Sequence, residues 1–434
     1  MKRLFRYLSP FAPDQSGAAA VFFEYGGVIV ICDAGGCTGN ICGFDEPRWF
    51  SMRSRVFSAG LRDIDAILGQ DDKLVRKIAD AVTGQDAHFV CLIGTPVPSI
   101  IATDFRAICR MIEKQTGVPA VWVDTNGMET YEQGQKKAYL ALIHLAERLR
   151  DPAGSSAGEA AVGSGKEAAG AEEETVGAEE ESAGSGKEAA PFTGVWGATP
   201  LDLPAGDSAD RLRARFQREG KRAEIFGMGS AWERLPDLFN AEENLVVSPS
   251  GLAPAEYLNE HFGIPYRTGF LLSDEDWGEA PEAADGGFPE DAGILIVHQK
   301  LFADEVRKMM ERVLPEFSGR ITEASFFECG EGRNAGTGDG RDGGSGKAQD
   351  GGGCLFLEGE SDLIRLVRDE NFRVIAADPV MRRALPEYSG TFLELPHYAV
   401  SGQVFSPDSE DAFLRKIKKG FLLSLREETS SREA

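Results

Sequence analysis

The sequence has far fewer basic than acidic residues, no long apolar run and few cysteines. Its 434 residues carry a formal net charge of −24. This charge disfavours nucleic acids and anionic membrane surfaces as partners, because both repel a negative surface. No stretch approaches the roughly eighteen consecutive apolar residues of a membrane-spanning helix. The basic residues at the N-terminus are not followed by an apolar segment, so we expect no secretory signal and a cytoplasmic location.

The seven cysteines do not suggest a disulfide framework in a chain of this length. In a reducing cytosol such thiols are more often buried, catalytic or bound to metal. The five histidines do not form a zinc motif of the H-E-x-x-H kind, and no G-x-S-x-G elbow is present. Hydrolytic chemistry therefore has no support in the sequence.

Two low-complexity segments interrupt the chain. Residues 151–192 contain ten acidic residues but only two lysines, and residues 330–353 contain eleven glycines. Each segment has too little apolar surface to offset the entropy lost on ordering, so we expect an acidic linker and a disordered insertion. Both contain Gly-Ser-Gly-Lys, but a phosphate-binding loop needs a longer spacing between a buried strand and a helix.

Outside these segments, short apolar runs alternate with amphipathic helical segments. Expected strands include 27–32, 88–93 and 119–123, and a long helix is expected over 131–149. Fully apolar short strands between helices are typical of a parallel sheet covered on both faces. Because the pattern restarts twice, the sequence predicts an α/β fold with three Rossmann-like parallel-sheet domains. The predicted units are domains at 1–150, 193–290 and 291–405, and a C-terminal helix and tail at 406–434.

Several segments, taken in order, resemble the nitrogenase component 1 proteins. The resemblance covers most of the chain outside the two low-complexity segments. It rests on Asp33-Ala-Gly-Gly-Cys37, Ile93 to Asp104, Gly194 to Asp202, Val247-Ser-Pro-Ser-Gly251, Ala377-Asp-Pro379 and Leu395 to Gly402. The family includes nitrogenase subunits, tetrapyrrole reductases and cofactor-assembly scaffolds, so the fold alone does not fix the function.

The resemblance implies a subunit of an iron–sulfur oxidoreductase. In such a complex a homologous subunit, or a second copy of the chain, forms a dimer or tetramer, and an ATP-dependent iron–sulfur reductase delivers electrons. The implied cofactor is an iron–sulfur cluster of the [4Fe–4S] type, which the chain either holds by itself or shares with the partner subunit. The implied substrate is a small molecule or a tetrapyrrole-like compound. The alternative is a non-catalytic scaffold or partner subunit for metal-cofactor assembly.

Family members usually place three cysteines of one chain at the cluster. Only Cys37 matches such a position here, since the other two positions fall near Ala12 and at Pro96. No cysteine lies between Cys109 and Cys329, so the thiolate that anchors the larger catalytic cofactor of nitrogenase is missing. Nitrogen fixation is therefore not expected.

Other cysteines offer substitute ligands. Cys32, Cys37 and Cys42 form a C-x4-C-x4-C run through a glycine-rich loop, and Cys91 lies in the next expected strand. Thiolates are soft donors that suit iron–sulfur clusters. The alternative is that Cys32 and Cys91 are small buried hydrophobic residues at the ends of core strands.

Four further residues are weaker candidates for substrate binding or docking. Asp45, Glu46 and Arg48 follow the glycine-rich loop, where they either line a substrate cavity or docking face or form a structural ion pair. His397 lies near the position of the cofactor histidine of the family. It either binds a metal or donates a proton, or is a loop histidine hydrogen-bonded by the backbone.

Overall fold

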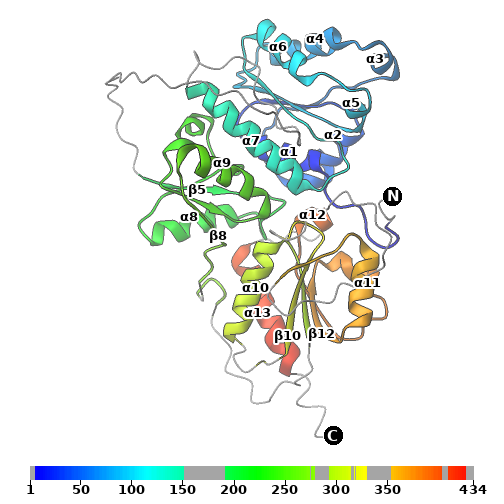
Figure 1. Ribbon diagram of the computed structural model, residues 1–434, viewed down its shortest axis with the longest axis vertical. Helices are drawn as coiled ribbons and strands as arrows, with labels where there is room; N and C mark the ends of the chain where they lie inside the picture. The colour runs from blue at the N-terminus through cyan, green and yellow to red at the C-terminus, as the bar shows by residue number, and fades with distance from the viewer. Residues whose placement is uncertain are drawn as a thin grey trace, which may run out of the picture.

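The computed structural model describes residues 5–150, 191–273, 275–278, 293–313, 317, 319–329, 353–402 and 409–426. The predicted linker 151–192 and insertion 330–353 lie almost entirely outside these residues. The described chain forms three units, each built on its own sheet with helices on both faces (Figure 1). The three sheets contain only parallel strand pairs, which confirms the predicted fold class. The predicted domain boundaries stay predictions.

The first unit has a four-stranded sheet in the order β2-β1-β3-β4. Its strands are β1 (Val28–Ile31), β2 (Val56–Ser58), β3 (Val90–Ile93) and β4 (Ala120–Val123). Its helices are α1 (Asp14–Phe22), α2 (Gly36–Asn40), η1 (Ile41–Asp45), η2 (Pro47–Phe50), α3 (Asp63–Leu68), α4 (Asp71–Val82), α5 (Pro96–Ile100), α6 (Phe105–Thr116) and α7 (Tyr131–Arg150). Buried side chains of α4 and α6 cover one face of the sheet, and those of α1 and α7 cover the other.

The second unit has a sheet in the order β6-β5-β7-β8. Its elements are β5 (Thr193–Trp196), α8 (Ser208–Arg218), β6 (Ala223–Ile225), η3 (Trp232–Asn240), β7 (Glu243–Val246), η4 (Pro249–Gly251), α9 (Leu252–Phe262) and β8 (Tyr266–Thr268). The face that carries Trp196 shares its apolar core with α7 of the first unit. The opposite face, which carries Val195, shares a core with the third unit. Apolar burial therefore continues from one unit to the next.

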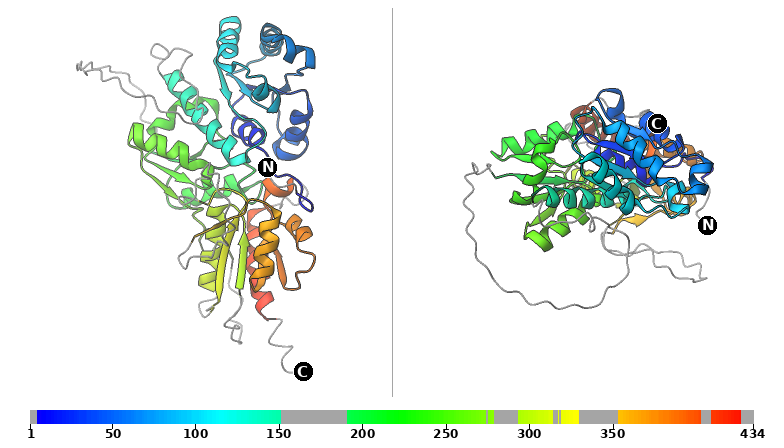
Figure 2. Two further views of the ribbon diagram at one scale, coloured as in Figure 1. Left: turned by 45° about the vertical axis from the view of Figure 1, so that its right-hand side comes forward. Right: turned by 90° about the horizontal axis from the view of Figure 1, so that it is seen from above.

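The third unit has a five-stranded sheet in the order β11-β10-β9-β12-β13. Its elements are β9 (Gly293–Val297), α10 (Lys300–Val313), β10 (Arg320–Ser325), β11 (Leu355–Phe356), α11 (Glu360–Asp369), β12 (Phe372–Ala377), η5 (Pro379–Ala384), β13 (Thr391–Glu394), α12 (Tyr398–Ser401) and α13 (Glu410–Arg426). Helices α10 and α13 cover one face and α11 covers the other (Figures 1 and 2). Within the described residues, no helix combines the length and the apolar character needed to cross a membrane.

Helices α1 and α7 cross at unusually close range. A Cβ atom on Gly17 would lie 2.0 Å from the Tyr131 carbonyl oxygen, and one on Gly134 would lie 1.7 Å from the Asp14 carbonyl oxygen. Glycine is therefore required on both sides of the crossing, because any side chain would collide with the opposing backbone. This contact fixes the start of α7, a helix that lies between the first and second units and begins near the third (Figure 1).

Candidate functional site

The turn after β1 presents two of the predicted cysteine ligands. Gly35 begins it with φ of 116°, a conformation that favours glycine. Helix α2 and the π-helical turn η1 follow without a break. The buried Asp33 carboxylate fixes the turn by accepting hydrogen bonds from the Thr38 backbone N–H (2.8 Å) and the Ser58 hydroxyl (2.6 Å).

The structure separates the four predicted cysteines into two kinds. Cys37 on α2 and Cys42 on η1 are half-buried against the core between the first sheet and α7. Cys32 is buried on the sheet face covered by α4 and α6, and Cys91 is buried on the opposite face. Among the residues that the structure describes, no group of three or more His, Cys, Asp or Glu side chains is arranged to hold a metal ion.

The surroundings of the half-buried Cys37 and Cys42 thiols favour their protonated forms. Burial, together with the carboxylates of Asp33 and Asp14, raises the pKa of Cys37. Burial and the carboxylates of Glu46 and Asp33 raise the pKa of Cys42 to about 11. At neutral pH both groups are thiols in the free chain, so a bound metal has to displace their protons.

The glycines of this turn face open space. A Cβ atom placed on Gly36, Gly39 or Gly43 would meet no atom within 4 Å. Packing within the chain therefore does not require glycine at these three positions. Their absent side chains leave room for a bulky group beside the turn, although the Gly39 N–H already donates to the Gly35 carbonyl oxygen (3.1 Å).

This donor set fits one part of a shared iron–sulfur site. Cys37 and Cys42 offer two accessible sulfur atoms, and the glycines leave room for a bulky group beside them. A cluster with four thiolates from this chain alone does not fit, because Cys32 and Cys91 are enclosed in core on opposite faces of the sheet. Further thiolate ligands are not offered by the described residues, so another chain is the source to test.

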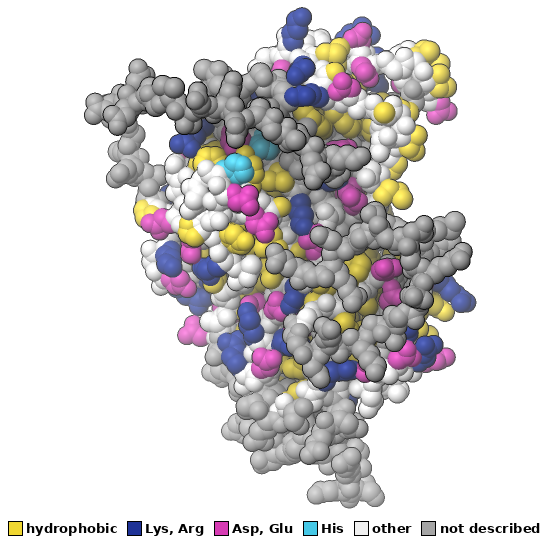
Figure 3. Space-filling model, in the orientation of Figure 1, with side chains coloured by type: hydrophobic (Ala, Val, Ile, Leu, Met, Phe, Trp, Pro, Cys, Tyr) yellow, Lys and Arg dark blue, Asp and Glu magenta, His cyan; other side chains and the backbone are white. Residues whose placement is uncertain are grey.

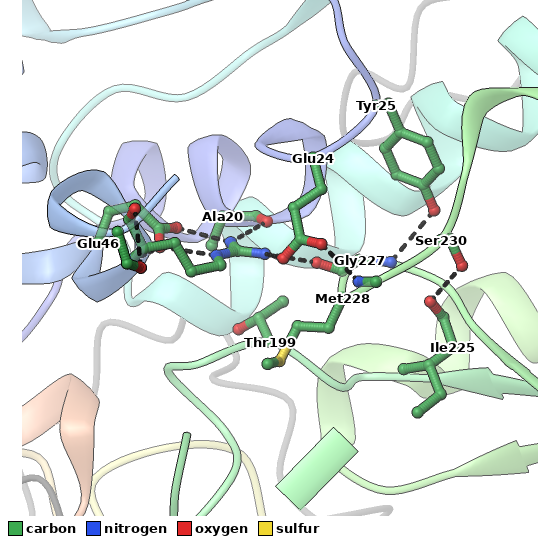
Figure 4. Close-up of polar contacts among 12 residues, drawn as sticks. Ala20, Glu24, Tyr25, Glu46, Thr199, Ile225, Gly227, Met228 and Ser230 are labelled. Atoms are coloured by element: carbon green, nitrogen blue, oxygen red, sulfur yellow. Dashed lines mark hydrogen bonds and ion pairs between the residues drawn. The ribbon is translucent and has the colours of Figure 1, made fainter. Parts of the chain in front are cut away.

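Arg48 joins the turn to the second unit. Its guanidinium donates to the Glu46 carboxylate (2.7 and 2.6 Å) and to Glu24 (2.6 Å). It also donates to the carbonyl oxygens of Ala20 (2.7 Å) and Gly227 (2.8 Å). Figure 4 shows these acceptors gathered from α1, from the loop after η1 and from the second unit.

The pKa of Arg48 is raised despite its burial. Burial alone would lower it, but the charges of Glu46 and Glu24 outweigh that effect. A buried arginine with every donor engaged is typical of a structural junction between domains. Of the two predicted roles, the ion pair is therefore observed for Glu46 and Arg48.

Asp45 does not take part in this ion pair. Its carboxylate accepts hydrogen bonds from the Ser16 hydroxyl (2.6 Å) and the Asn40 amide (2.7 Å). Burial raises the pKa of Asp45 to about 6. Asp45 therefore links η1 to α1. It is a further acidic group close to the cysteine turn, besides Asp33 and Glu46.

A cleft of roughly 190 Å³ lies where the three units meet. Its walls are mostly apolar, with Arg48, Ser51, Tyr398 and Ser401 as the polar groups. The lining residues are Pro47, Arg48 and Ser51 from the first unit, Pro200, Leu203 to Gly206 and Met228 from the second, and Pro396, Tyr398, Ser401 and Gly402 from the third. A second cavity of roughly 310 Å³ lies between α8 and α13, where arginines and acidic residues form ion pairs.

The cleft touches the cysteine turn. The Tyr398 hydroxyl donates to the Phe44 carbonyl oxygen (3.2 Å), and Phe44 lies two residues after Cys42. Gly402 comes close to the same oxygen, since a Cβ atom there would be 3.6 Å away. The third unit therefore closes the cleft directly against η1. The sequence analysis did not identify Tyr398 or Ser401, whose only signal was their place in the family-like segment 395–402.

His397 lies behind the cleft wall and is buried. Its Nε2 is 3.2 Å from the Tyr131 hydroxyl, and its ring stacks on His298 with centroids 4.3 Å apart. Burial and the neighbouring His298 lower the pKa of His397, and burial lowers the pKa of His298 to about 4. Both rings are therefore neutral at pH 7, and they join the third unit to the start of α7.

Three parallel-sheet units around a cleft, with half-buried thiols on an adjoining glycine turn, define the class as a three-unit α/β protein. The chain belongs to the nitrogenase component 1 type oxidoreductase family, whose model matches residues 14–273. This confirms the family to which the sequence segments pointed. A comparison of the sequence with curated proteins finds no significant match.

Two solved structures share the fold. One, described as nitrogenase Cp1 at pH 6.5, superposes with a TM-score of 0.61 at 10% sequence identity, covering 100% of this chain and 96% of the other. The second, nitrogenase Cp1 at pH 5, has a TM-score of 0.61 at 13% identity, covering 99% and 91%. At these identities the likeness concerns the fold.

Proposed function

We propose that the chain is a subunit of a nitrogenase-like iron–sulfur oxidoreductase that reduces a small molecule in the three-unit cleft. In this proposal Cys37 and Cys42 bind the cluster together with ligands from a partner subunit. When bound, the cluster supplies single electrons, which an ATP-dependent iron protein delivers. The observation that carries the proposal is the contact of Tyr398, in the cleft wall, with the turn that holds both thiols.

The size of the cleft favours a small substrate. Pockets for drug-sized ligands usually have volumes of about 300–1,000 Å³. The cleft lined by the described residues measures roughly 190 Å³, which favours a molecule smaller than a tetrapyrrole. The Arg48 donors are all engaged within the chain, so the polar groups left for a ligand are the hydroxyl oxygens of Ser51, Tyr398 and Ser401, which can accept hydrogen bonds from a small molecule.

An apolar edge beside the turn supports a partner subunit at this place. Loops after β1, β3 and β4 reach the same edge of the first sheet, and they expose Phe44, Phe50, Ile100, Ile101 and Met128. Ile100 is 83% exposed. Hydrophobic side chains also gather over α3 and α5 (Figure 3). Exposed apolar patches of this kind mark protein–protein contacts.

A second candidate function is a non-catalytic partner or scaffold in metal-cofactor assembly. The thiol count favours it, because only two of the predicted thiol ligands are accessible and acidic neighbours raise the pKa of both. In this case the partner subunit would hold the cluster, and this chain would complete the assembly.

Anaerobic purification of the full chain, with its partner retained, tests the proposal. We expect iron and acid-labile sulfide, and a paramagnetic signal after reduction, that Cys37→Ser and Cys42→Ser each abolish. Cys32→Ala and Cys91→Ala should keep the iron, since neither thiol reaches the turn. Cys329→Ser is the matched control, because Cys329 is a half-buried thiol in the third unit.

An iron-free chain that copurifies with a cluster-bearing homologous subunit would support the second candidate instead. Loss of iron in Cys32→Ala or Cys91→Ala, but not in Cys37→Ser, would overturn the assignment of ligands.

A further inference from the structure

Two thiols outside the cysteine turn lie in contact in the third unit. The Sγ atoms of Cys329 and Cys354 are 2.8 Å apart, and both residues are half-buried. Cys329 follows the end of β10 and Cys354 directly precedes β11. The parallel pairing of Ala324 with Leu355 brings these two chain segments together at the edge of the sheet.

The separation of the two sulfur atoms is short for unbonded groups. Unbonded heavy atoms of this size usually stay about 3.5–4.0 Å apart, whereas sulfur atoms in a disulfide are about 2 Å apart. A movement of less than about 1 Å would bring these thiols to bonding distance. Partial exposure lets a small reagent reach them, unlike Cys32, Cys91 and Cys109, which are buried.

We propose that Cys329 and Cys354 form a redox-active dithiol that exchanges with low-molecular-weight disulfides of the glutathione type. The Cys329 thiolate attacks the small disulfide, forms a mixed disulfide and releases one small thiolate. Cys354 then loses its proton to solvent and attacks the Cys329 sulfur, which expels the second small thiolate. The protein dithiol loses two electrons and two protons, and the small disulfide is reduced to two thiols.

The order of attack follows from the surroundings of the pair. The contact with Cys329, together with burial, raises the pKa of Cys354. Cys354 is therefore the poorer first nucleophile, because the thiolate is the attacking form. Once Cys329 carries the mixed disulfide, Cys354 is the resolving thiol beside it.

The pair lies next to a contact between two units. Glu328, the residue before Cys329, accepts a hydrogen bond from the Gln133 amide (2.5 Å) and forms an ion pair with Lys136. Its backbone N–H donates to the buried Glu132 carboxylate (2.8 Å). All three partners belong to the first turns of α7. The dithiol therefore lies one residue from the attachment of the third unit to α7.

The test is a redox titration of the full chain with reduced and oxidised glutathione, followed by acid quenching, alkylation and tryptic peptide mass spectrometry. Trypsin cuts between the two cysteines, which lie in the peptides Ile321–Arg333 and Ala348–Arg365. We expect these peptides to become linked with loss of two hydrogens. Half-conversion should need at least about tenfold less oxidised glutathione than in the urea-unfolded chain, where the loop has to close by itself.

Two variants and one internal standard complete the experiment. Cys354→Ser should trap the mixed disulfide on Cys329, whereas Cys329→Ser should react more slowly at Cys354. Cys109, which is buried, should stay reduced throughout. Single glutathione adducts without the linked peptide, no reaction at any ratio, or equal conversion in folded and unfolded chain would each overturn the proposal. Iron binding at Cys37 is a separate readout, so the two proposals can fail independently.

Discussion

At the scale of single residues, buried charge is concentrated where the units meet. Arg48 joins α1, the cysteine turn and the second unit through five hydrogen bonds to four residues. Asp202 in the second unit accepts from the Gln135 amide of α7 (2.8 Å) and from the Thr199 hydroxyl (2.8 Å). Such groups cost solvation energy, so they are stable only while their partners stay in place.

Asp202 should make the stability of the protein depend on pH. Burial raises the pKa of Asp202 to about 6, above its ordinary value of 3.8. The folded state then holds the proton more tightly, so this group's stabilisation is complete below pH 4 and is lost as the pH rises through 6. We expect the free energy of unfolding of the native chain, relative to Asp202→Asn, to fall by about 2 kcal/mol between pH 4 and pH 7.

Urea unfolding at several pH values, followed by circular dichroism, measures this difference. Asp210→Asn is the control for removal of a charge, because its carboxylate is 84% exposed. A difference between native chain and Asp202→Asn that stays constant with pH would contradict the prediction.

At the scale of elements, the crossing of α1 and α7 depends on glycine. An exposed glycine within a helix normally gains up to about 1 kcal/mol of stability on replacement by alanine. At Gly134 the new Cβ atom would lie 1.7 Å from the Asp14 carbonyl oxygen, so the helices must separate. We expect Gly134→Ala to lower the free energy of unfolding by about 3 kcal/mol or more.

Gly39→Ala is the matched helical substitution, since its Cβ atom would meet nothing within 4 Å. Thermal and urea unfolding of both variants should show opposite signs, with Gly39→Ala neutral or slightly more stable. A stabilised Gly134→Ala would show that the two helices are not in backbone contact.

Elements with a clear apolar period were predictable, and those without one were not. The expected helix over 131–149 is α7, and the expected strands at 27–32 and 88–93 are β1 and β3 within two residues. Helix α1 was not predicted. It is buried on all sides, so its sequence lacks the alternation of apolar and polar residues that marks a helix with one exposed face. The short edge strands β8 and β11 were missed because each contains at most three residues.

The candidate site was predictable only in part, for a related reason. The glycine-rich turn could be found because its glycines and cysteines are neighbours in sequence. The cleft combines residues more than 300 positions apart, such as Arg48 and Tyr398, and no local pattern marks such a meeting. Which face of the sheet Cys32 and Cys91 occupy likewise depends on strand register.

At the scale of the whole molecule, the apolar edge should control association. Placing a charge at Ile100 leaves the core unchanged, because the side chain is 83% exposed. Burying that charge in a subunit contact without a partner is costly. We expect Ile100→Glu to remain folded but to lose the copurifying subunit or the dimer, as measured by analytical ultracentrifugation.

Leu423→Glu is the control for this prediction. Leu423 lies on α13, where its side chain is 45% exposed. This helix packs on the sheet of the third unit, whereas the apolar edge belongs to the sheet of the first. This variant should associate as the native chain does. Equal association of Ile100→Glu and the native chain would remove the apolar edge from the proposed contact.

Helix α7 touches all three units along its length. Its first turns hold the third unit through Tyr131 and Gln133, its middle packs on Trp196 of the second through Tyr139, and its last turns return to the first through Arg148 and Glu113. A single rigid rod pinned at three places resists hinge bending. One unit could move away from the cleft only after these contacts with α7 break. We therefore expect a ligand to enter and leave through the opening of the cleft while the three units keep their relative positions.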